Sequence, residues 1–246
     1  MEKKKLKKFG LVGKEIKYSF SKKYFEKKFD VLNYDNFLYT NYDLKDLSNI
    51  RSILDDIELI GLNVTIPYKE KIIPYLDKLS EKATKIGAVN TIYFKNKKII
   101  GDNTDVTGFE IALKSFMKNK IFNALVLGTG GASKAINFVL RKNKVNSISV
   151  SRKPKTNQIH YKEISKELLK SHPLIINCTP LGTYPSVNES PPLPYELIDD
   201  DNYLFDLIYN PETTLFMKKG LDNGAKVTNG LKMLIEQAEA SWKLWK

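Results

Sequence analysis

A glycine-rich turn at 128–133 carries a clear chemical signal in this sequence. Gly128 permits a tight turn out of an apolar strand, and Gly130 lets the backbone approach a pyrophosphate at the N-terminus of the next helix. A plain strand-to-helix turn would also contain glycine, and Ser133 stands where this fingerprint usually has glycine or alanine. The order of strand, turn, helix and strand over 124–151 favours a dinucleotide site.

The residues after the second strand of this unit indicate which dinucleotide binds. An NAD site uses an acidic residue about 20 positions beyond the turn to hold the ribose 2′-hydroxyl. This chain has Ser151, Arg152 and Lys153 there, and no acid. A guanidinium makes bidentate, charge-assisted hydrogen bonds to phosphate, so Arg152, assisted by its two neighbours, suits the 2′-phosphate of NADP. The alternative is an ordinary basic turn on the surface.

Lys69 is a candidate for acid–base chemistry and ends the segment NVTIPYK (63–69). Pro67 is expected to begin a helix that runs to about Leu76, with Lys69 in its first turn. The helix dipole disfavours a cation there and tends to lower the pKa of Lys69, which suits a proton donor near neutral pH. The alternative is a solvated lysine, which most lysines of this chain must be.

Asp102 and Asp105 are two candidate carboxylates in the segment GDNTD (101–105), beside a helix predicted over 104–118, and they cannot both be assumed catalytic. A carboxylate at such a junction can exchange a proton or bind a substrate hydroxyl. Asn103, Thr104 or Asp105 can equally cap the helix by accepting from its first backbone N–H groups. The residues alone leave the catalytic and the capping interpretations open.

An alternation of strands and helices must position these groups. Strands are expected at 7–13, 36–42, 59–66, 89–94, 98–100, 124–127, 147–151, 174–178, 203–208 and 226–227, and helices at 21–29, 44–57, 67–76, from 81, at 104–118, after the glycine turn, and at 231–244. This order predicts an α/β fold, in which ligands bind at the carboxyl ends of parallel strands.

Composition restricts the class of protein. The chain has 246 residues and 42% hydrophobic residues, an ordinary globular balance. No apolar run approaches the roughly 18 residues of a membrane span. The single cysteine, Cys178, excludes an internal disulfide and a cysteine zinc cage, and with two histidines we expect no metal site. We therefore expect a cytoplasmic protein with no membrane partner.

The net charge of +12 raises nucleic-acid binding as another class of function. Only Arg51, Arg141 and Arg152 are arginine, the residue that reads phosphates and base edges in a bidentate manner. The other positive charges are lysines spread along the chain, which is typical of a solvated surface. We expect no nucleic-acid partner, with a basic interaction protein on a nucleotide-binding scaffold as the alternative.

Eight segments in a fixed order make the chain resemble the shikimate dehydrogenase family. They are Ser19-x-Ser21, NVTIPYK (63–69), GAVNT (87–91), GDNTD (101–105), GTGGASKA (128–135), NCTPLG (177–182), DLIYNP (206–211) and NGLKMLIEQA (229–238). Each is weak alone, but the ordered set is specific and covers nearly the whole chain. The resemblance implies NADPH-dependent reduction of 3-dehydroshikimate to shikimate in aromatic amino-acid biosynthesis. A broader quinate/shikimate dehydrogenase that uses NAD is the alternative.

The resemblance also implies a domain organisation. A split N-terminal α/β substrate domain, residues 1–105 and 229–246, would be closed by the C-terminal helix, and residues 106–228 would form a Rossmann-type NADP-binding domain. The expected assembly is a monomer or a homodimer.

Residue roles follow from the same resemblance. Lys69 and Asp105 match the catalytic pair. The substrate contacts are Ser19, Ser21, Thr65, Asn90, Tyr209 and Gln237. The NADP contacts are Gly128, Gly130, Gly131, Ala132 and Arg152, with Gly230 near the nicotinamide. Ser19 and Ser21 are two residues apart, so an extended backbone would point both hydroxyls the same way, as carboxylate binding requires.

Overall fold

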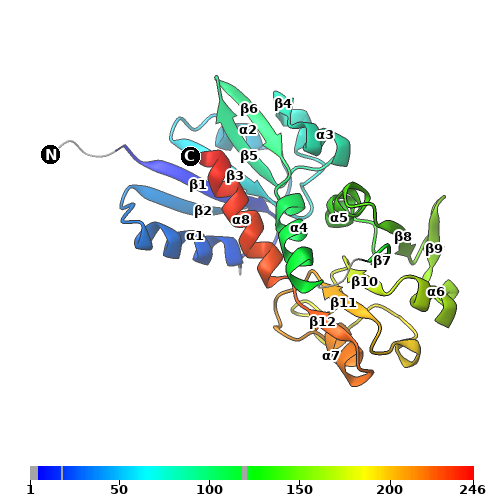
Figure 1. Cartoon of the computed structure of the whole chain (residues 1–246). Coiled ribbons are helices and arrows are strands. Elements are labelled where there is room, and N and C mark those ends of the chain that lie inside the picture. The colour runs from blue at the N-terminus through cyan, green and yellow to red at the C-terminus, as the bar shows by residue number, and fades with distance from the viewer. Residues whose placement is uncertain (1–4, 18, 118–120) are drawn as a thin grey trace. The chain divides into compact units, whose positions relative to one another are not determined.

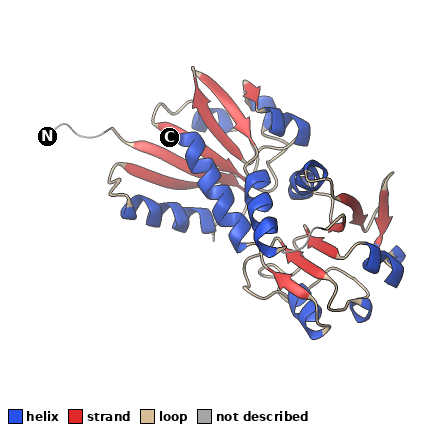
Figure 2. Ribbon diagram, in the orientation of Figure 1, coloured by secondary structure: helices blue, strands red, loops and turns tan. Residues whose placement is uncertain are grey.

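The computed structural model describes residues 5–17, 19–117 and 121–246. The chain divides into two compact units, one made of residues 1–104 and 238–246 and the other of residues 105–237. Each unit contains, in its described residues, a six-stranded sheet with helices packed on it (Figures 1 and 2). The α/β fold class predicted from the sequence is confirmed.

The sheet of the first unit has the strand order β2-β1-β3-β5-β6-β4. Its strands are β1 (Lys7–Gly13), β2 (Phe37–Asp43), β3 (Leu59–Val64), β4 (Lys78–Leu79), β5 (Thr91–Lys95) and β6 (Lys98–Asp102). β1 pairs in parallel with β2 and β3, whereas β5 is antiparallel to β3 and β6. The carboxyl ends of β1 and β3 therefore meet at one edge, beside the start of β5.

Helices cover both faces of this sheet. They are α1 (Phe20–Val31), α2 (Ile50–Leu54), the short 3₁₀ turn η1 (Ile73–Tyr75), α3 (Glu81–Ile86) and the last turns of α8 (Leu231–Trp245). α1 and α8 pack on one face, where Phe25 and Trp245 lie with ring centroids 5.2 Å apart. A side chain at Gly61 would collide with the Trp245 indole, so α8 packs directly on the backbone of β3.

The helix predicted over 44–57 is mostly wrong, because only α2 forms within it. The Asp46 carboxylate accepts from the Ser48 N–H over 2.9 Å, a local turn that competes with helical hydrogen bonds. The Leu44 carbonyl accepts from the Tyr68 hydroxyl over 2.7 Å and so is also lost to a helix. The apolar stripe exists, but it fills the other face of the sheet from turns as well as from a helix.

The sheet of the second unit is parallel throughout, with the order β12-β11-β10-β7-β8-β9. Its strands are β7 (Asn123–Leu127), β8 (Asn146–Ser151), β9 (Gln158–His160), β10 (Leu174–Asn177), β11 (Tyr203–Asp206) and β12 (Lys226–Thr228). Its helices are α4 (Asp105–Phe116), α5 (Gly131–Lys142), α6 (Lys166–Ser171), α7 (Leu215–Asp222) and the first turns of α8, with the 3₁₀ turns η2 (Tyr161–Glu163) and η3 (Tyr195–Leu197). Within the described residues, no helix combines the length and the apolar content that a membrane crossing needs.

Both faces of this sheet are buried. α6 and α7 pack on one face with Leu125 and Leu127 of β7. On the other face, Phe109 of α4 lies edge-on to Phe205 of β11, with ring centroids 5.2 Å apart. A parallel strand covered on both sides reads as a continuous apolar run, which is why β7 was predictable.

α8 contributes to both units. Residues 231–237 group with the second unit and 238–245 with the first, whereas the sequence-based division placed the whole segment from 229 in the first. The early turns pack against α4, where a side chain at Gly108 would collide with the Met233 carbonyl. The later turns bury Trp242 and Trp245 on the first sheet.

Candidate functional site

The carboxyl edge of β1 and β3 brings several predicted residues together. Thr65 follows β3, and its N–H donates to the Val12 carbonyl over 2.9 Å. A Cβ at Gly13, the end of β1, would come within 2.5 Å of the Thr65 Cγ2 atom. Asn90 immediately precedes β5, and its carbonyl accepts from the Val64 N–H over 2.8 Å. Thr65 and Asn90 thus lie at one edge of the sheet.

Lys69 lies in turns beyond this edge, and the helix predicted over 67–76 is wrong. The Lys69 carbonyl accepts from the Val89 N–H over 2.7 Å, whereas an α-helix would need that carbonyl for the N–H of Ile73. Pro74 has no N–H with which to continue a helical pattern. Lys69 is half-buried and outside any helix, so the expected effect of a helix dipole on it is also wrong.

Asn90 is buried in a network of polar side chains. Its Oδ1 accepts from the Thr104 N–H over 2.6 Å and from the hydroxyls of Thr104 and Thr91 over 3.1 Å each. The Thr91 hydroxyl lies 2.7 Å from the Ser241 Oγ of α8. Asn63 Nδ2 donates to the same Oγ over 2.9 Å. Buried networks of this kind specify one arrangement of their members, so Asn90 is held in a single orientation.

Ser19 and Ser21 do not lie on one extended segment, and that prediction is wrong. Ser19 is the N-cap of α1, and its hydroxyl accepts from the Ser21 N–H over 3.1 Å. Ser21 lies inside the helix, is buried, and hydrogen-bonds the Tyr39 hydroxyl. The Ser19 N–H donates to the Ile16 carbonyl in the loop after β1. Ser19 therefore lies near the sheet edge, while Ser21 takes part in packing α1 on the sheet.

In the second unit, Asp105 and Gln237 lie on two helices that approach closely. Asp105 is buried and begins α4. One turn later, a Cβ at Gly108 would come within 2.9 Å of the Gln237 Cβ. Gln237 is buried as well, and its Nε2 donates to the Leu234 carbonyl over 3.0 Å. Gly108 allows this close approach because it has no side chain. A glycine inside a predicted helix was visible in the sequence, but its packing against α8 was not.

The glycine turn follows β7, an interior strand of the parallel sheet. Gly128 has a φ of +99°, and its N–H donates to the Val150 carbonyl over 2.9 Å. Gly130 caps the twelve-residue α5, and a Cβ there would meet nothing within 4 Å. Thr129 and Gly130 are exposed, so the backbone at the N-terminus of α5 is accessible, as it must be to receive a pyrophosphate. The Ser133 hydroxyl donates to the Gly130 carbonyl over 2.7 Å and closes the first turn.

The hydrogen bond from the Gly128 N–H to the Val150 carbonyl also places the end of β8 next to the glycine turn. Ser151 ends β8, and its hydroxyl accepts from the Lys153 N–H over 3.2 Å. Arg152 and Lys153 are exposed, and residues 152–157 contain no acid. Cations without a carboxylate thus occupy the place where the adenosine ribose lies in dinucleotide folds.

Asp206 carries no role in the sequence-based predictions, although it ends the apolar strand β11. Its carboxylate is completely buried. It accepts from Asn177 Nδ2 over 3.0 Å, from the Ile208 N–H over 3.0 Å and from the Thr214 hydroxyl over 2.6 Å. Burial raises the pKa of Asp206 to about 6, although the three hydrogen bonds act to lower it. The sequence could have pointed to Asp206, because an acidic residue at the end of an apolar strand is unusual.

Tyr209 and Gly230 belong to the same edge of the second sheet. Tyr209 lies in the loop 206–211 after β11. The Gly230 N–H donates to the Ile208 carbonyl over 2.9 Å. A side chain at Gly230 would collide with the Leu207 carbonyl, so only glycine fits there. The start of α8 is therefore bound to the loop that contains Tyr209.

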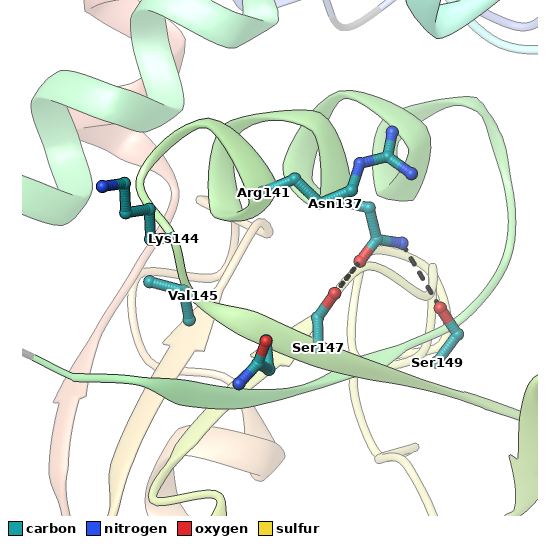
Figure 3. A pocket seen from close by; sticks show the side chains of 7 residues that line it. Asn137, Arg141, Lys144, Val145, Ser147 and Ser149 are labelled. Carbon is teal, nitrogen blue, oxygen red and sulfur yellow. Dashed lines mark hydrogen bonds between the residues drawn. The ribbon is translucent and has the colours of Figure 1, made fainter.

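A polar pocket of about 440 Å³ lies between α5 and β8 (Figure 3). Asn137 Nδ2 donates to the Ser149 Oγ over 3.3 Å, and the Ser147 hydroxyl donates to Asn137 Oδ1 over 2.9 Å. Arg141 and Lys144 also line it. The pocket reaches the amino end of β8, and none of the predicted site residues line it. The Asn137 amide and the hydroxyls of Ser147 and Ser149 are thus engaged with one another.

Known proteins resemble this chain over nearly its whole length. Residues 11–92 match a family model described as the shikimate dehydrogenase substrate binding domain. The chain is 38% identical over 255 residues to the shikimate dehydrogenase (NADP(+)) of Caldanaerobacter subterraneus subsp. tengcongensis, with 96% of this chain and 90% of that protein covered. It is 36% identical over 260 residues to the enzyme of the same name from Methanococcus maripaludis strain C7, with 98% and 91% covered.

A solved structure shows the same likeness. The shikimate 5-dehydrogenase of Thermus thermophilus, in complex with NADP(H) and shikimate, superimposes with a TM-score of 0.87 at 30% identity. The match covers 98% of this chain and 94% of that one.

Proposed function

This chain belongs to the shikimate dehydrogenase family, and we propose that it catalyses the reversible, NADPH-dependent reduction of 3-dehydroshikimate to shikimate. The observation that carries the proposal is the open glycine turn at Gly130, followed by Arg152 where an NAD site has an acid. It occurs in a chain that resembles enzymes named for NADP(+) over nearly its full length. The reaction makes the protein an oxidoreductase of aromatic amino-acid biosynthesis.

The residues of the second unit fit NADP. In this proposal Gly128, Gly130, Gly131 and Ala132 hold the pyrophosphate with backbone N–H groups. The free space around Gly130, where a Cβ would meet nothing within 4 Å, supports this assignment. Ser151, Arg152 and Lys153 bind the 2′-phosphate, and Gly230 supports the nicotinamide. When bound, NADPH supplies the hydride of the reaction.

Lys69 and Asp105 perform the acid–base work. The substrate carbonyl develops alkoxide character as it is reduced, and this oxygen needs a positioned proton donor. The Lys69 ammonium group stabilises the developing charge and donates the proton to that oxygen. The Asp105 carboxylate accepts a hydrogen bond from a substrate hydroxyl and so orients the ring. In the reverse direction Lys69 takes the proton back.

The remaining polar residues bind the substrate. Those assigned this role are Ser19, Ser21, Thr65, Asn90, Tyr209 and Gln237. Ser19 binds through its hydroxyl, and Ser21 contributes by holding that hydroxyl with its own N–H. The location of Thr65 and Asn90 at one edge of the first sheet supports their assignment.

We also infer the working form of the protein. Residues 1–105 and 229–246 form the substrate-binding domain and residues 106–228 form the NADP-binding domain, with Tyr209 and Gly230 as the two assigned residues that serve the ligand of the other domain. The enzyme works in the cytoplasm as a monomer or a homodimer, without a nucleic-acid partner. The single cysteine supports the location in the cytoplasm, and the dispersal of the lysines supports the absence of a nucleic-acid partner.

One assay tests the function. Absorbance at the NADPH band is followed with shikimate or quinate, and with NADP or NAD, in all four pairings. We expect turnover to be fastest with shikimate and NADP. Equal turnover of quinate with NAD would favour the broader enzyme. A salt-dependent shift with nucleic acid and no turnover in any pairing would favour the basic interaction protein.

A further inference from the structure

Three chain segments converge on the Asp206 carboxylate. Asn177 approaches from the end of β10, Ile208 from the loop that Asp206 begins, and Thr214 from the N-cap of α7. Thr214 is shared, because its hydroxyl also accepts from the Met217 N–H over 3.2 Å. One side chain therefore joins two loops and a helix start at the carboxyl edge of the second sheet.

The first of these loops leads to the glycine turn. Asn177 Oδ1 accepts from the Thr179 N–H over 3.0 Å and from the Thr179 hydroxyl over 2.7 Å. The same hydroxyl accepts from the Leu181 N–H over 3.3 Å. A Cβ at Gly128 would come within 3.1 Å of the Thr179 Cγ2 atom. The 177–182 loop thus packs against the glycine turn in a shape that depends on Asn177.

The second loop leads to Gly230. Ile208 donates its N–H to Asp206 and accepts from the Gly230 N–H through its carbonyl. The 177–182 loop therefore contacts Gly128 and the 206–211 loop contacts Gly230, and the proposed function assigns both glycines to the cofactor site.

A buried aspartate at position 206 lowers the stability of the folded protein. Its three partners are neutral, and a buried carboxylate with neutral partners costs more stability than an apolar side chain would. Two further titratable groups are sensitive to it, Cys178 and Tyr195. Burial is the main cause that raises the pKa of each, and the charge of Asp206 raises both further. Fold stability alone does not account for an acid here.

We propose that Asp206 is a positioning residue for the cofactor, whose carboxylate holds the 177–182 and 206–211 loops in the arrangement that binds NADPH. This inference rests on the proposed function. Asp206 touches neither substrate nor cofactor in this role and acts through Asn177 and Ile208.

Two variants of Asp206 separate the acceptor from the charge. Asp206→Asn keeps an oxygen at Oδ1, the atom that accepts from Asn177 and Ile208, and Asp206→Ala removes it. Asn202→Ala is the matched control. Asn202 is also buried, it accepts from the Asp199 N–H over 3.1 Å, and it lies just before the other end of β11.

The measurements are the dissociation constant of NADPH, followed by its fluorescence on binding, and thermal unfolding of each variant. Asp206→Ala is expected to weaken NADPH binding roughly tenfold or more, because two loops must then be ordered on binding. Asp206→Asn is expected to restore binding to within about threefold of wild type, since it keeps the acceptor. Asn202→Ala is expected to lower the unfolding temperature and leave NADPH binding unchanged.

Equal NADPH binding by Asp206→Ala and Asn202→Ala would overturn the inference. If Asp206→Ala does not fold, Thr179→Val takes its place, because it removes both hydrogen bonds of the Thr179 hydroxyl, to Asn177 Oδ1 and from the Leu181 N–H, and leaves Asp206 intact. Wild-type NADPH binding in Thr179→Val would then overturn the inference. A wild-type protein that neither binds NADPH nor reduces 3-dehydroshikimate is a different result, which overturns the proposed function and this inference together.

Discussion

The backbone N–H of Val89 donates to the carbonyl of Lys69 over 2.7 Å and joins two segments that are 20 residues apart in the sequence. This bond ties the turn that contains Lys69 to the segment leading into Asn90. The proposed proton donor and a proposed substrate contact therefore share one backbone support in the first unit.

Lys69→Ala is expected to lower kcat by roughly 10²–10⁴-fold, because the alkoxide loses its proton donor. Shikimate binding should remain measurable by calorimetry. Lys71→Ala is the control, since Lys71 is exposed in the same segment. Turnover of Lys69→Ala within a few fold of the control would remove Lys69 from the mechanism.

Asp105→Asn should lower kcat by a similar factor, about 10²-fold or more, and should also weaken shikimate binding. The carboxylate is a stronger acceptor for a substrate hydroxyl than an amide is. Steady-state kinetics and thermal unfolding are measured on the same preparation. A lower unfolding temperature with unchanged kinetics would show that Asp105 serves only the start of α4.

Arg152→Ala should raise the Michaelis constant for NADP about tenfold to a hundredfold and leave that for NAD nearly unchanged. Charge-assisted hydrogen bonds contribute about 1.5–3 kcal/mol each, and only NADP carries the 2′-phosphate. Arg141→Ala is the control, because Arg141 lines the separate pocket between α5 and β8. An equal loss with both cofactors would mean that Arg152 holds the adenine or the fold.

Ser241→Ala should lower the free energy of unfolding by about 1–3 kcal/mol, measured by urea titration. The fully buried Ser241 Oγ accepts from Asn63 Nδ2 over 2.9 Å, the shortest of the three hydrogen bonds that this Nδ2 donates, and losing a buried hydrogen-bond partner costs about that much. The exposed Ser52→Ala is the control and should change stability by less than about 0.5 kcal/mol. If both variants unfold alike, the network around Asn90 contributes no net stability.

Stability should also depend on pH through Asp206. Its pKa is about 6 in the folded protein against an ordinary 3.8, so the folded state binds the proton more tightly than the unfolded state between these values. The free energy of unfolding therefore rises as pH falls through 6. Relative to Asp206→Asn, wild type should gain about 1.4 kcal/mol between pH 7.5 and 5.0. Urea titrations of both proteins at the two pH values measure this, and parallel behaviour would contradict the raised pKa.

Local sequence was sufficient for much of the second unit. The strand β7, the glycine turn and α5 follow from an apolar run, from glycines at defined spacing and from an apolar stripe, all within about 20 residues. The absence of an acid after β8 is likewise a local fact, and it indicates NADP without any knowledge of the tertiary contacts. The ordered motifs then identified the family, which the comparisons confirm.

Long-range hydrogen bonds decided the rest. The segment 67–76 has helical signals, but Val89 takes the carbonyl of Lys69 that a helix requires. Ser19 and Ser21 were expected on an extended segment because both hydroxyls would then point the same way, as carboxylate binding requires, yet Ser19 caps α1 and Ser21 is buried in it. The bond from Val89 is not encoded within 67–76, whereas the helix predicted over 21–29 did indicate that Ser21 is helical.

Asp206 shows most clearly the difference between what the sequence predicts and what the tertiary structure decides. The sequence places an acid at the end of an apolar strand and says nothing of its partners. Asn177, Ile208 and Thr214 reach it because β10 and β11 pair in parallel and α7 begins beside them. A hydrogen bond depends on where two groups meet in space, whereas periodicity reports only how one segment faces its surroundings. The sequence therefore determined the elements and the family, and the tertiary structure decided which polar groups hold one another.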